Sequence, residues 1–122
     1  MLLQKETPND AVHIKAYTKG KIILNVGEKN TTVFLKENQL VNLTSITSFE
    51  NINLALLDEI SDNQPEVLII GTGESHKIMS IDLIQYLNKK GIAVEAMASR
   101  QACHTYEVMA HDKRKVNALI FI

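Results

Sequence analysis

The chain has 122 residues, of which 45% are hydrophobic and 22% charged, close to the average of a folded globular domain. Its 13 basic and 14 acidic residues give a net charge of -1, which excludes a strongly basic nucleic-acid binder and a strongly acidic disordered tail. A single cysteine excludes an intrachain disulfide and suits a reducing compartment. We therefore expect one domain, residues 1–122, with no nucleic-acid partner.

The first third of the chain is predicted to be β structure. Short runs rich in apolar and β-branched residues at 13–17, 21–26 and 31–35 are separated by turn signals at Gly20 and at residues 27–30. A short fourth strand is predicted at residues 40–43. This pattern indicates an antiparallel meander, which would form a β-rich N-terminal layer over about residues 12–44.

From about residue 51 to residue 122 the pattern changes to alternating helices and strands. Apolar residues at helical spacing alternate with short continuous apolar runs, which are typical of strands buried on both faces. Helical crossovers between such strands favour a largely parallel sheet. The predicted elements are a helix at about 51–61, a strand at 66–70, a helix that Ser80 caps and Gly91 ends, a strand at 92–97, a helix at about 100–112 and a strand at 116–122.

The sequence predicts no targeting segment and no membrane insertion. Residues 1–10 contain Glu6 and Asp10 with Lys5 as the only cation, which does not fit a secretory signal or a mitochondrial presequence. The longest apolar runs, such as residues 67–70, are far too short to span a bilayer. We therefore expect a cytoplasmic protein.

Gly71, Thr72 and Gly73 follow a predicted buried strand where the chain turns toward a helix. Ligands of open α/β sheets bind at the carboxyl ends of strands, and two glycines let the backbone approach an anion closely. The motif is incomplete, because a phosphate-binding loop ends in Gly-Lys-Ser/Thr and the dinucleotide fingerprint has a third glycine where His76 stands. The simpler interpretation is a tight turn that needs glycine for its backbone angles.

Cys103 lies near the start of the predicted last helix, where backbone dipoles can lower the pKa of a thiol. No base can be identified for it, and an unpaired cysteine is commonly buried and inert. His104, Glu107 and His111 share one helical face, but the two histidines are two turns apart, about 10 Å, which is too far for one ion. We expect no catalytic residue, no metal and no cofactor.

Residues 65–73, 91–97, 102–106 and 114–116 resemble, in their order and spacing, the small proteins related to mitochondrial complex I assembly factor three and the adipogenesis-associated domain protein. The resemblance is strong over residues 65–119 and looser over 14–35. It implies a three-layer α/β fold with a mixed central sheet and an extra N-terminal β layer. It implies no established catalytic activity, and it implies action through protein partners.

The resemblance also singles out positions that the family usually keeps. They are Gly71, Thr72, Gly73, Glu95, Met97, Cys103, Thr105, Tyr106 and Arg114. This chain has Ser99, His104 and Glu107 where the family commonly has Thr, Arg and Asn. The last two differences weaken both an anion site and a metal site.

These arguments converge on one crevice at the carboxyl ends of two neighbouring strands. We expect it to be lined by Gly71, Thr72, Gly73, Ser99, Arg100, Cys103 and His104, with the planar donor fork of Arg100 best suited to an anionic ligand or partner. The favoured hypothesis is a non-enzymatic protein-binding or assembly-factor-like module with an unidentified partner. The alternatives are a small-molecule or anion-binding protein, with thiol chemistry at Cys103 as one version, and a structural subunit of a homo-oligomer.

Overall fold

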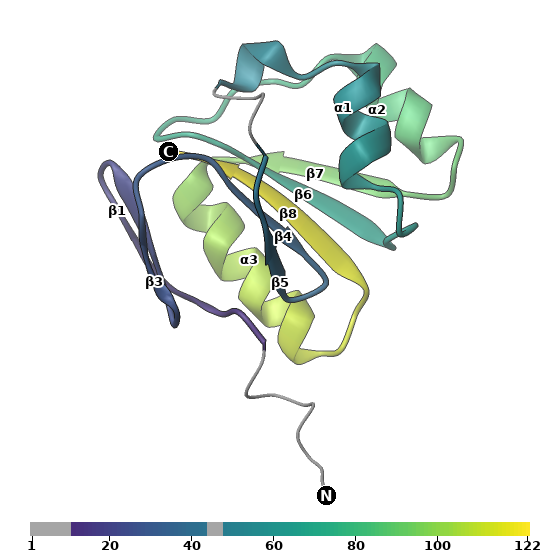
Figure 1. Cartoon of the computed structure of the whole chain (residues 1–122). Coiled ribbons are helices and arrows are strands. Elements are labelled where there is room, and N and C mark those ends of the chain that lie inside the picture. The colour runs from purple at the N-terminus through teal and green to yellow at the C-terminus, as the bar shows by residue number, and fades with distance from the viewer. Residues whose placement is uncertain (1–10, 44–47) are drawn as a thin grey trace, which may run out of the picture.

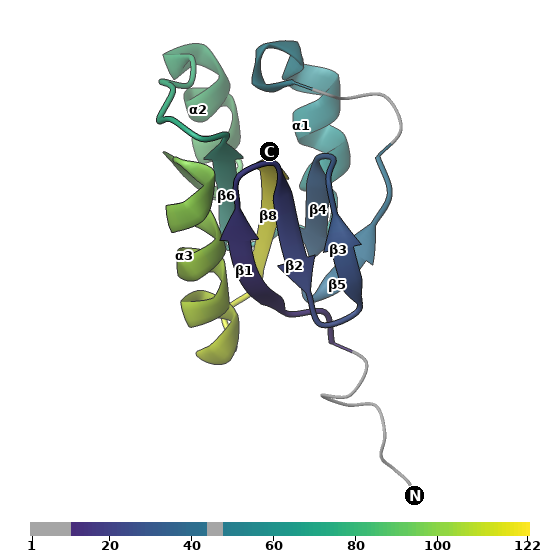
Figure 2. The ribbon, with the colours of Figure 1, turned by 90° about the vertical axis from the view of Figure 1, so that its left-hand side faces the viewer.

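The computed structural model describes residues 11–43 and 48–122, and in this part of the chain two β-sheets and three α-helices pack as layers (Figure 1). A five-stranded mixed sheet forms the middle layer. Helices α1 and α2 cover one face, and α3 lies beside a three-stranded sheet on the other (Figure 2). The predicted three-layer α/β fold with an extra N-terminal β layer is thus confirmed. Residues 1–10, which carry the targeting prediction, and residue 44, the predicted end of the N-terminal layer, lie outside the described residues.

The central sheet has the strand order β5-β4-β8-β6-β7, so that β8 lies in the middle. Strand β6 pairs in parallel with β7 and β8, as the alternating pattern predicts, whereas β4 pairs antiparallel with β8 and β5. The bounds are β4 Val33–Lys36, β5 Gln39–Val41, β6 Val67–Thr72, β7 Ala93–Met97 and β8 Val116–Phe121.

Both faces of β6 are buried, which explains its continuous apolar sequence. Val67 and Ile69 face the core shared with α3 and the small sheet, while Leu68 and Ile70 face the core under α1 and α2. The side chains alternate because successive residues of a strand point to opposite faces. The central sheet therefore separates two hydrophobic cores.

The small sheet is an antiparallel meander of β1 (Ile14–Thr18), β2 (Lys21–Leu24) and β3 (Gly27–Lys29). Two predictions about this region are wrong. Residues 27–30 were expected to be a turn, but most of them form β3, because their backbone pairs with β2. The strand expected at residues 31–35 as the third of the meander is β4, which joins the central sheet.

The helices begin and end largely where the apolar pattern predicts. They are α1 (Leu54–Ile60), α2 (Ile81–Asn88) and α3 (Ser99–His111), and a short 3-10 helix, η3, lies before α1 at Phe49–Asn51. The Asn53 side chain caps α1 by accepting a hydrogen bond from the Leu56 N–H at 2.8 Å. Ser80 occupies the predicted cap position of α2, but its side chain makes no capping hydrogen bond. Gly91 follows α2 with φ of 81°, the left-handed conformation that the sequence predicts.

Helix α3 is tied to the loop between β4 and β5. The fully buried Tyr106 accepts a hydrogen bond from the Asn38 N–H at 3.0 Å, and its hydroxyl donates to the Asn38 side-chain oxygen at 3.1 Å. Asn38 has φ of 72°, a left-handed backbone conformation that is uncommon for residues other than glycine, and the two hydrogen bonds to Tyr106 help to hold the turn in it. The contact fixes α3 against the central sheet.

Candidate functional site

The ends of β6 and β7 lie side by side. In the parallel pairing Ile70 is opposite Ala96, and Gly71 is opposite Met97. The segments that follow the two strands therefore start from the same edge of the sheet, as the sequence analysis expects. This edge is also the carboxyl end of β8, where ligands of α/β proteins commonly bind.

Ser99 ties the ends of these strands together. Its hydroxyl accepts a hydrogen bond from the Gly73 N–H at 2.8 Å and donates to the Phe121 carbonyl, while its own N–H donates to the Gly73 carbonyl at 2.8 Å. A Cβ atom at Gly71 would lie 2.8 Å from the Ser99 hydroxyl oxygen. Glycine is thus needed at position 71 for the close approach of α3. Both residues are buried, and they fill the corner instead of opening it.

Thr72 shapes the loop that leaves this corner. Its buried hydroxyl donates to the Ser75 carbonyl at 2.7 Å and accepts from the Lys77 N–H at 3.1 Å. The loop therefore holds its form through side chain to backbone bonds. Gly73 has φ of 109°, which only glycine adopts readily, so the predicted turn role of this residue is present.

A cavity of about 430 Å³ opens next to this loop, which we call the edge cavity. Residues of the β1–β2 turn, of η3, of the loop after β6 and of the end of β8 line it. Its lining residues are Lys19, Gly20, Ser48, Phe49, Glu50, Thr72, Gly73, Glu74, Ser75, Lys77, Phe121 and Ile122. Of the predicted crevice residues, Thr72 and Gly73 line it.

Three other predicted crevice residues line a different and smaller cavity of about 180 Å³ between β1 and α3, whereas Gly71 and Ser99 line neither cavity. Arg100, Cys103 and His104 contribute to it together with Lys15 and Tyr17. The Arg100 Nη1 donates to the Tyr17 carbonyl at 3.1 Å, and the guanidinium carbon lies 5.5 Å from the centre of the Tyr17 ring. The two cavities share no lining residue, so the seven predicted residues do not surround one space.

Cys103 is buried, and burial raises the pKa of its thiol to about 12. The nearby Glu107 carboxylate adds to this effect, and Arg100 opposes it. At neutral pH the thiol is therefore protonated and a poor nucleophile. The raised pKa and the burial of Cys103 therefore argue against the hypothesis of a small-molecule site that uses thiol chemistry.

Glu107 is engaged with the small sheet. One carboxylate oxygen accepts a hydrogen bond from the Ile14 N–H at 2.8 Å, and the other lies 3.3 Å from His13 Nδ1. This contact anchors β1 to α3 and occupies the carboxylate that a metal site with His104 and His111 would need. In the part of the chain that the structure describes, no group of three or more His, Cys, Asp or Glu residues is placed to hold a metal ion.

The sequence analysis missed two features of this region. Phe49 and Glu50 border the edge cavity, where Lys77 Nζ lies 3.1 Å from the Glu50 carboxylate and 6.0 Å from the centre of the Phe49 ring. No motif marks them, since a 3-10 turn brings them there. The exposed side chains of Ile78 and Ile81 were also missed, although their place outside the apolar stripe of α2 is a usable signal.

No helix among residues 11–43 and 48–122 is both long and apolar enough to cross a bilayer.

The sequence of the chain is similar to those of several known proteins. The chain is 36% identical over 121 residues to the "13 kDa major membrane protein" of Francisella tularensis subsp. holarctica (strain LVS), covering 98% of each chain. It is 25% identical over 103 residues to "NADH dehydrogenase (ubiquinone) 1 alpha subcomplex assembly factor 3" of Xenopus tropicalis. That match covers 83% of this chain but only 56% of the frog protein.

Among solved structures, the NMR structure of a Xanthomonas campestris protein covers the whole chain with a TM-score of 0.86 and 26% identity, and 92% of that protein is matched. The predicted resemblance to complex I assembly factor relatives is thus confirmed. A family model described as "Protein of unknown function (DUF498/DUF598)" matches residues 14–121, and the chain therefore belongs to this family of small α/β proteins.

Proposed function

We propose that this chain is a non-enzymatic binding module that holds a protein partner, as its relatives named assembly factors suggest. The observation that carries the proposal is a pair of exposed isoleucines that follows, in the chain, the loop bordering the edge cavity. Ile78 is 86% exposed and Ile81 67% exposed, on the loop after β6 and at the start of α2. Exposed apolar side chains of this size, when grouped, commonly mark protein–protein contacts.

The edge cavity supports the same proposal. Three loops from distant parts of the sequence border it, and loops on a rigid sheet commonly carry binding residues. Lys19, Glu50, Glu74 and Lys77 are its charged lining residues, and of these Lys77 and Glu50 are paired with each other.

Site-specific photo-crosslinking tests the proposal. A photoreactive amino acid replaces the exposed Ser75, which borders the edge cavity, and in a matched control it replaces the exposed Lys113 at the far end of α3. We expect Ser75 to give a discrete adduct with one protein in the native cell and Lys113 to give none. The absence of an adduct from Ser75 at native expression levels contradicts a partner at this edge.

A second function has its own supporting observation. The small cavity between β1 and α3 is lined by the cationic Lys15 and Arg100 and by His104, without a carboxylate. Such a lining suits a small anion, whose oxygens match the planar donors of Arg100. Titration with inorganic phosphate, followed by NMR, checks this alternative, and an unchanged spectrum up to 20-fold excess in wild type removes it.

Two sequence predictions stay open beside these proposals. A cytoplasmic location is a prediction, because the Francisella relative is named a membrane protein. A homo-oligomer is likewise a prediction, which light scattering over a range of concentrations checks.

A further inference from the structure

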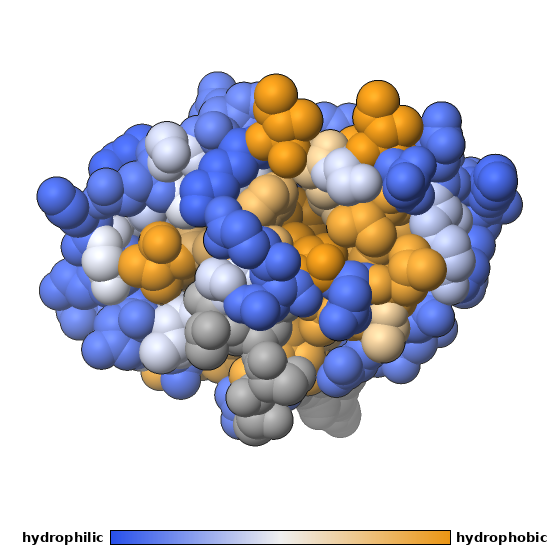
Figure 3. Space-filling view, turned by 90° about the horizontal axis from the view of Figure 1, so that it is seen from above, coloured by the Kyte–Doolittle hydropathy of each residue, from blue (hydrophilic) through white to orange (hydrophobic). Residues whose placement is uncertain are grey.

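Three exposed apolar side chains project from the helical layer opposite α3, and we call their surface the docking face. It consists of Leu54 at the start of α1, Ile78 on the loop before α2 and Ile81 at the start of α2, which are 48%, 86% and 67% exposed. Helices α1 and α2 lie side by side, and both start on the same side of the molecule (Figure 1). Viewed from that side, hydrophobic side chains gather over both helices among hydrophilic ones (Figure 3).

The fold does not require isoleucine at these positions. Between them, Met79 is buried in the core under α1 and α2, and the same core takes Ile84 and Leu87 from α2. The inner stripe of α2 is therefore complete without Ile78 and Ile81. The side chains of Ile78 and Ile81 thus add nothing to the core, and their apolar character favours a contact with another molecule.

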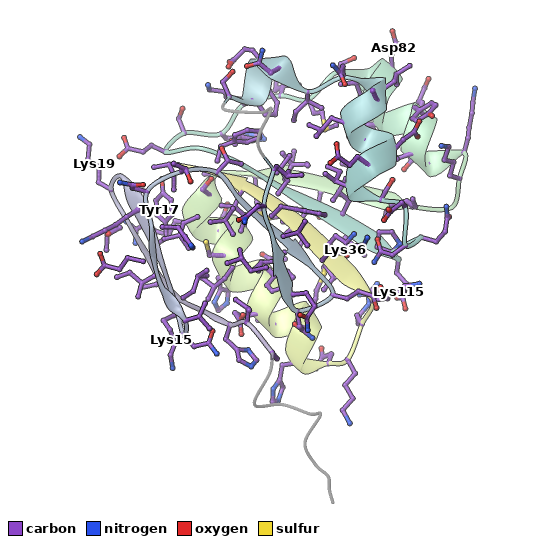
Figure 4. The ribbon with its side chains drawn as sticks, in the orientation of Figure 1. Lys15, Tyr17, Lys19, Lys36, Asp82 and Lys115 are labelled. Atoms are coloured by element: carbon purple, nitrogen blue, oxygen red, sulfur yellow. The ribbon has the colours of Figure 1, made fainter. Side chains whose placement is uncertain are left out.

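The docking face lies in a region with a surplus of acidic residues. Residues 48–60 and 74–90 carry five acidic residues and three lysines, whereas the whole chain has a net charge of -1. Two of these lysines, Lys77 and Lys90, are already paired with Glu50 and Asp58. Among the described residues, Glu59, Glu74 and Asp82 take part in no ion pair, and Asp82, which follows Ile81 in the sequence, points outward (Figure 4).

This charge decides between classes of occupant. An anionic lipid surface or an acidic segment would be repelled by the surplus carboxylates, because like charges across an interface are costly. A cationic segment would be attracted to them. Resting on the proposed function, we infer that the docking face binds a segment of a protein partner that presents apolar side chains flanked by Lys or Arg.

Defined peptides test this inference on the full chain. The probe is an amphipathic 15-residue peptide of leucine and lysine, and its matched control has glutamate in place of lysine. We expect the leucine–lysine peptide to bind, with NMR shift changes at Leu54, Ile78 and Ile81 and an affinity that falls as salt rises. The leucine–glutamate peptide is expected not to bind.

Variants separate the apolar from the charged contribution. Ile78→Ser with Ile81→Ser should weaken binding of the leucine–lysine peptide about tenfold or more, the scale expected for losing two buried aliphatic contacts. Val26→Ser, a change at a valine that is 61% exposed on the small sheet, is the matched control and should leave binding unchanged. Asp82→Asn should weaken binding less and reduce its salt dependence.

Four results would overturn the inference. They are equal binding of the two peptides, shift changes confined to other surfaces, flotation of the chain with phosphatidylglycerol vesicles that the isoleucine substitutions abolish, and a concentration-dependent dimer that the same substitutions abolish. The last two assign the face to lipid or to a second copy. A photo-crosslinked partner at Ser75 combined with any of these results leaves the proposed function standing while the inference fails.

Discussion

Adding one methyl group at Gly71 tests the close approach of α3 to β6. The Cβ atom of Gly71→Ala would lie 2.8 Å from the Ser99 hydroxyl oxygen, 3.0 Å from Ile120 Cγ2 and 3.1 Å from Ala102 Cβ. Gly71 is not among the glycines with positive φ, so backbone strain plays no part. Overpacking of this kind destabilises a fold by about 1–3 kcal/mol, and we expect about 2 kcal/mol.

Removing the Ser99 hydroxyl acts on the same corner in another way. Ser99→Ala leaves the buried Gly73 N–H and Phe121 carbonyl without this partner. Each unpaired buried group costs about 1–3 kcal/mol, so the substitution should cost about 3 kcal/mol in total. In the double variant Gly71→Ala/Ser99→Ala, the Ser99 hydroxyl oxygen, which is the atom closest to the new methyl group, is absent. The combined loss should be about 4 kcal/mol instead of the additive sum, a coupling of about 1 kcal/mol.

Urea unfolding followed by circular dichroism measures these differences through linear extrapolation. Ser75→Ala is the control, because Ser75 is exposed on the neighbouring loop and its side chain makes no hydrogen bond among the described contacts. Its free energy of unfolding should match that of the wild type. A fully additive double variant, or a neutral Gly71→Ala, would refute the reasoning that Ser99 is what requires glycine here.

Four further outcomes follow from the contacts of Cys103, Glu107 and Tyr106. Because burial raises the pKa of the Cys103 thiol to about 12, the native protein should resist a thiol reagent at pH 8 that reacts rapidly once urea unfolds the chain. The same shift stabilises the fold fully below the unfolded thiol pKa of about 8.5, and this stability should be lost as the pH rises toward 12, with a smaller loss in Cys103→Ala. Glu107→Ala should remove the acceptor of the Ile14 N–H and speed its hydrogen exchange, whereas Glu107→Gln should retain most of its protection. Tyr106→Phe should lower the unfolding free energy by about 1–2 kcal/mol through the loss of its bonds to Asn38, and an unchanged urea midpoint would contradict this.

The parallel half of the fold was predictable because its signals are local. Continuous apolar runs mark β6 and β8, and the apolar stripe of α3 follows a helical period. Strand β3 was not predictable, since Gly27, Glu28 and Lys29 have no strand pattern of their own and are extended only by pairing with β2. The placement of β4 in the central sheet depends on its pairing with β8, some 80 residues away, which propensity cannot show.

The sequence predicts at which edge of the sheet the candidate site lies, but not how side chains divide the space there. That Ile70 and Met97 end at one edge follows from parallel strands. That Ser99 would fill the corner does not follow, because it depends on how closely α3 approaches Gly71. The three-dimensional packing therefore divides one expected crevice into the edge cavity and the smaller cavity at Arg100.

The central position of β8 has a consequence for biosynthesis. It joins β4, from the first part of the chain, to β6, from the second, and it follows both of them in chain order. Until residues 116–121 emerge, the β4–β5 hairpin and the β6–β7 pair have no shared partner, and their apolar edges face the surroundings. The central sheet therefore cannot close before residues 116–121 are made, and until then general chaperones can bind the incompletely folded segments.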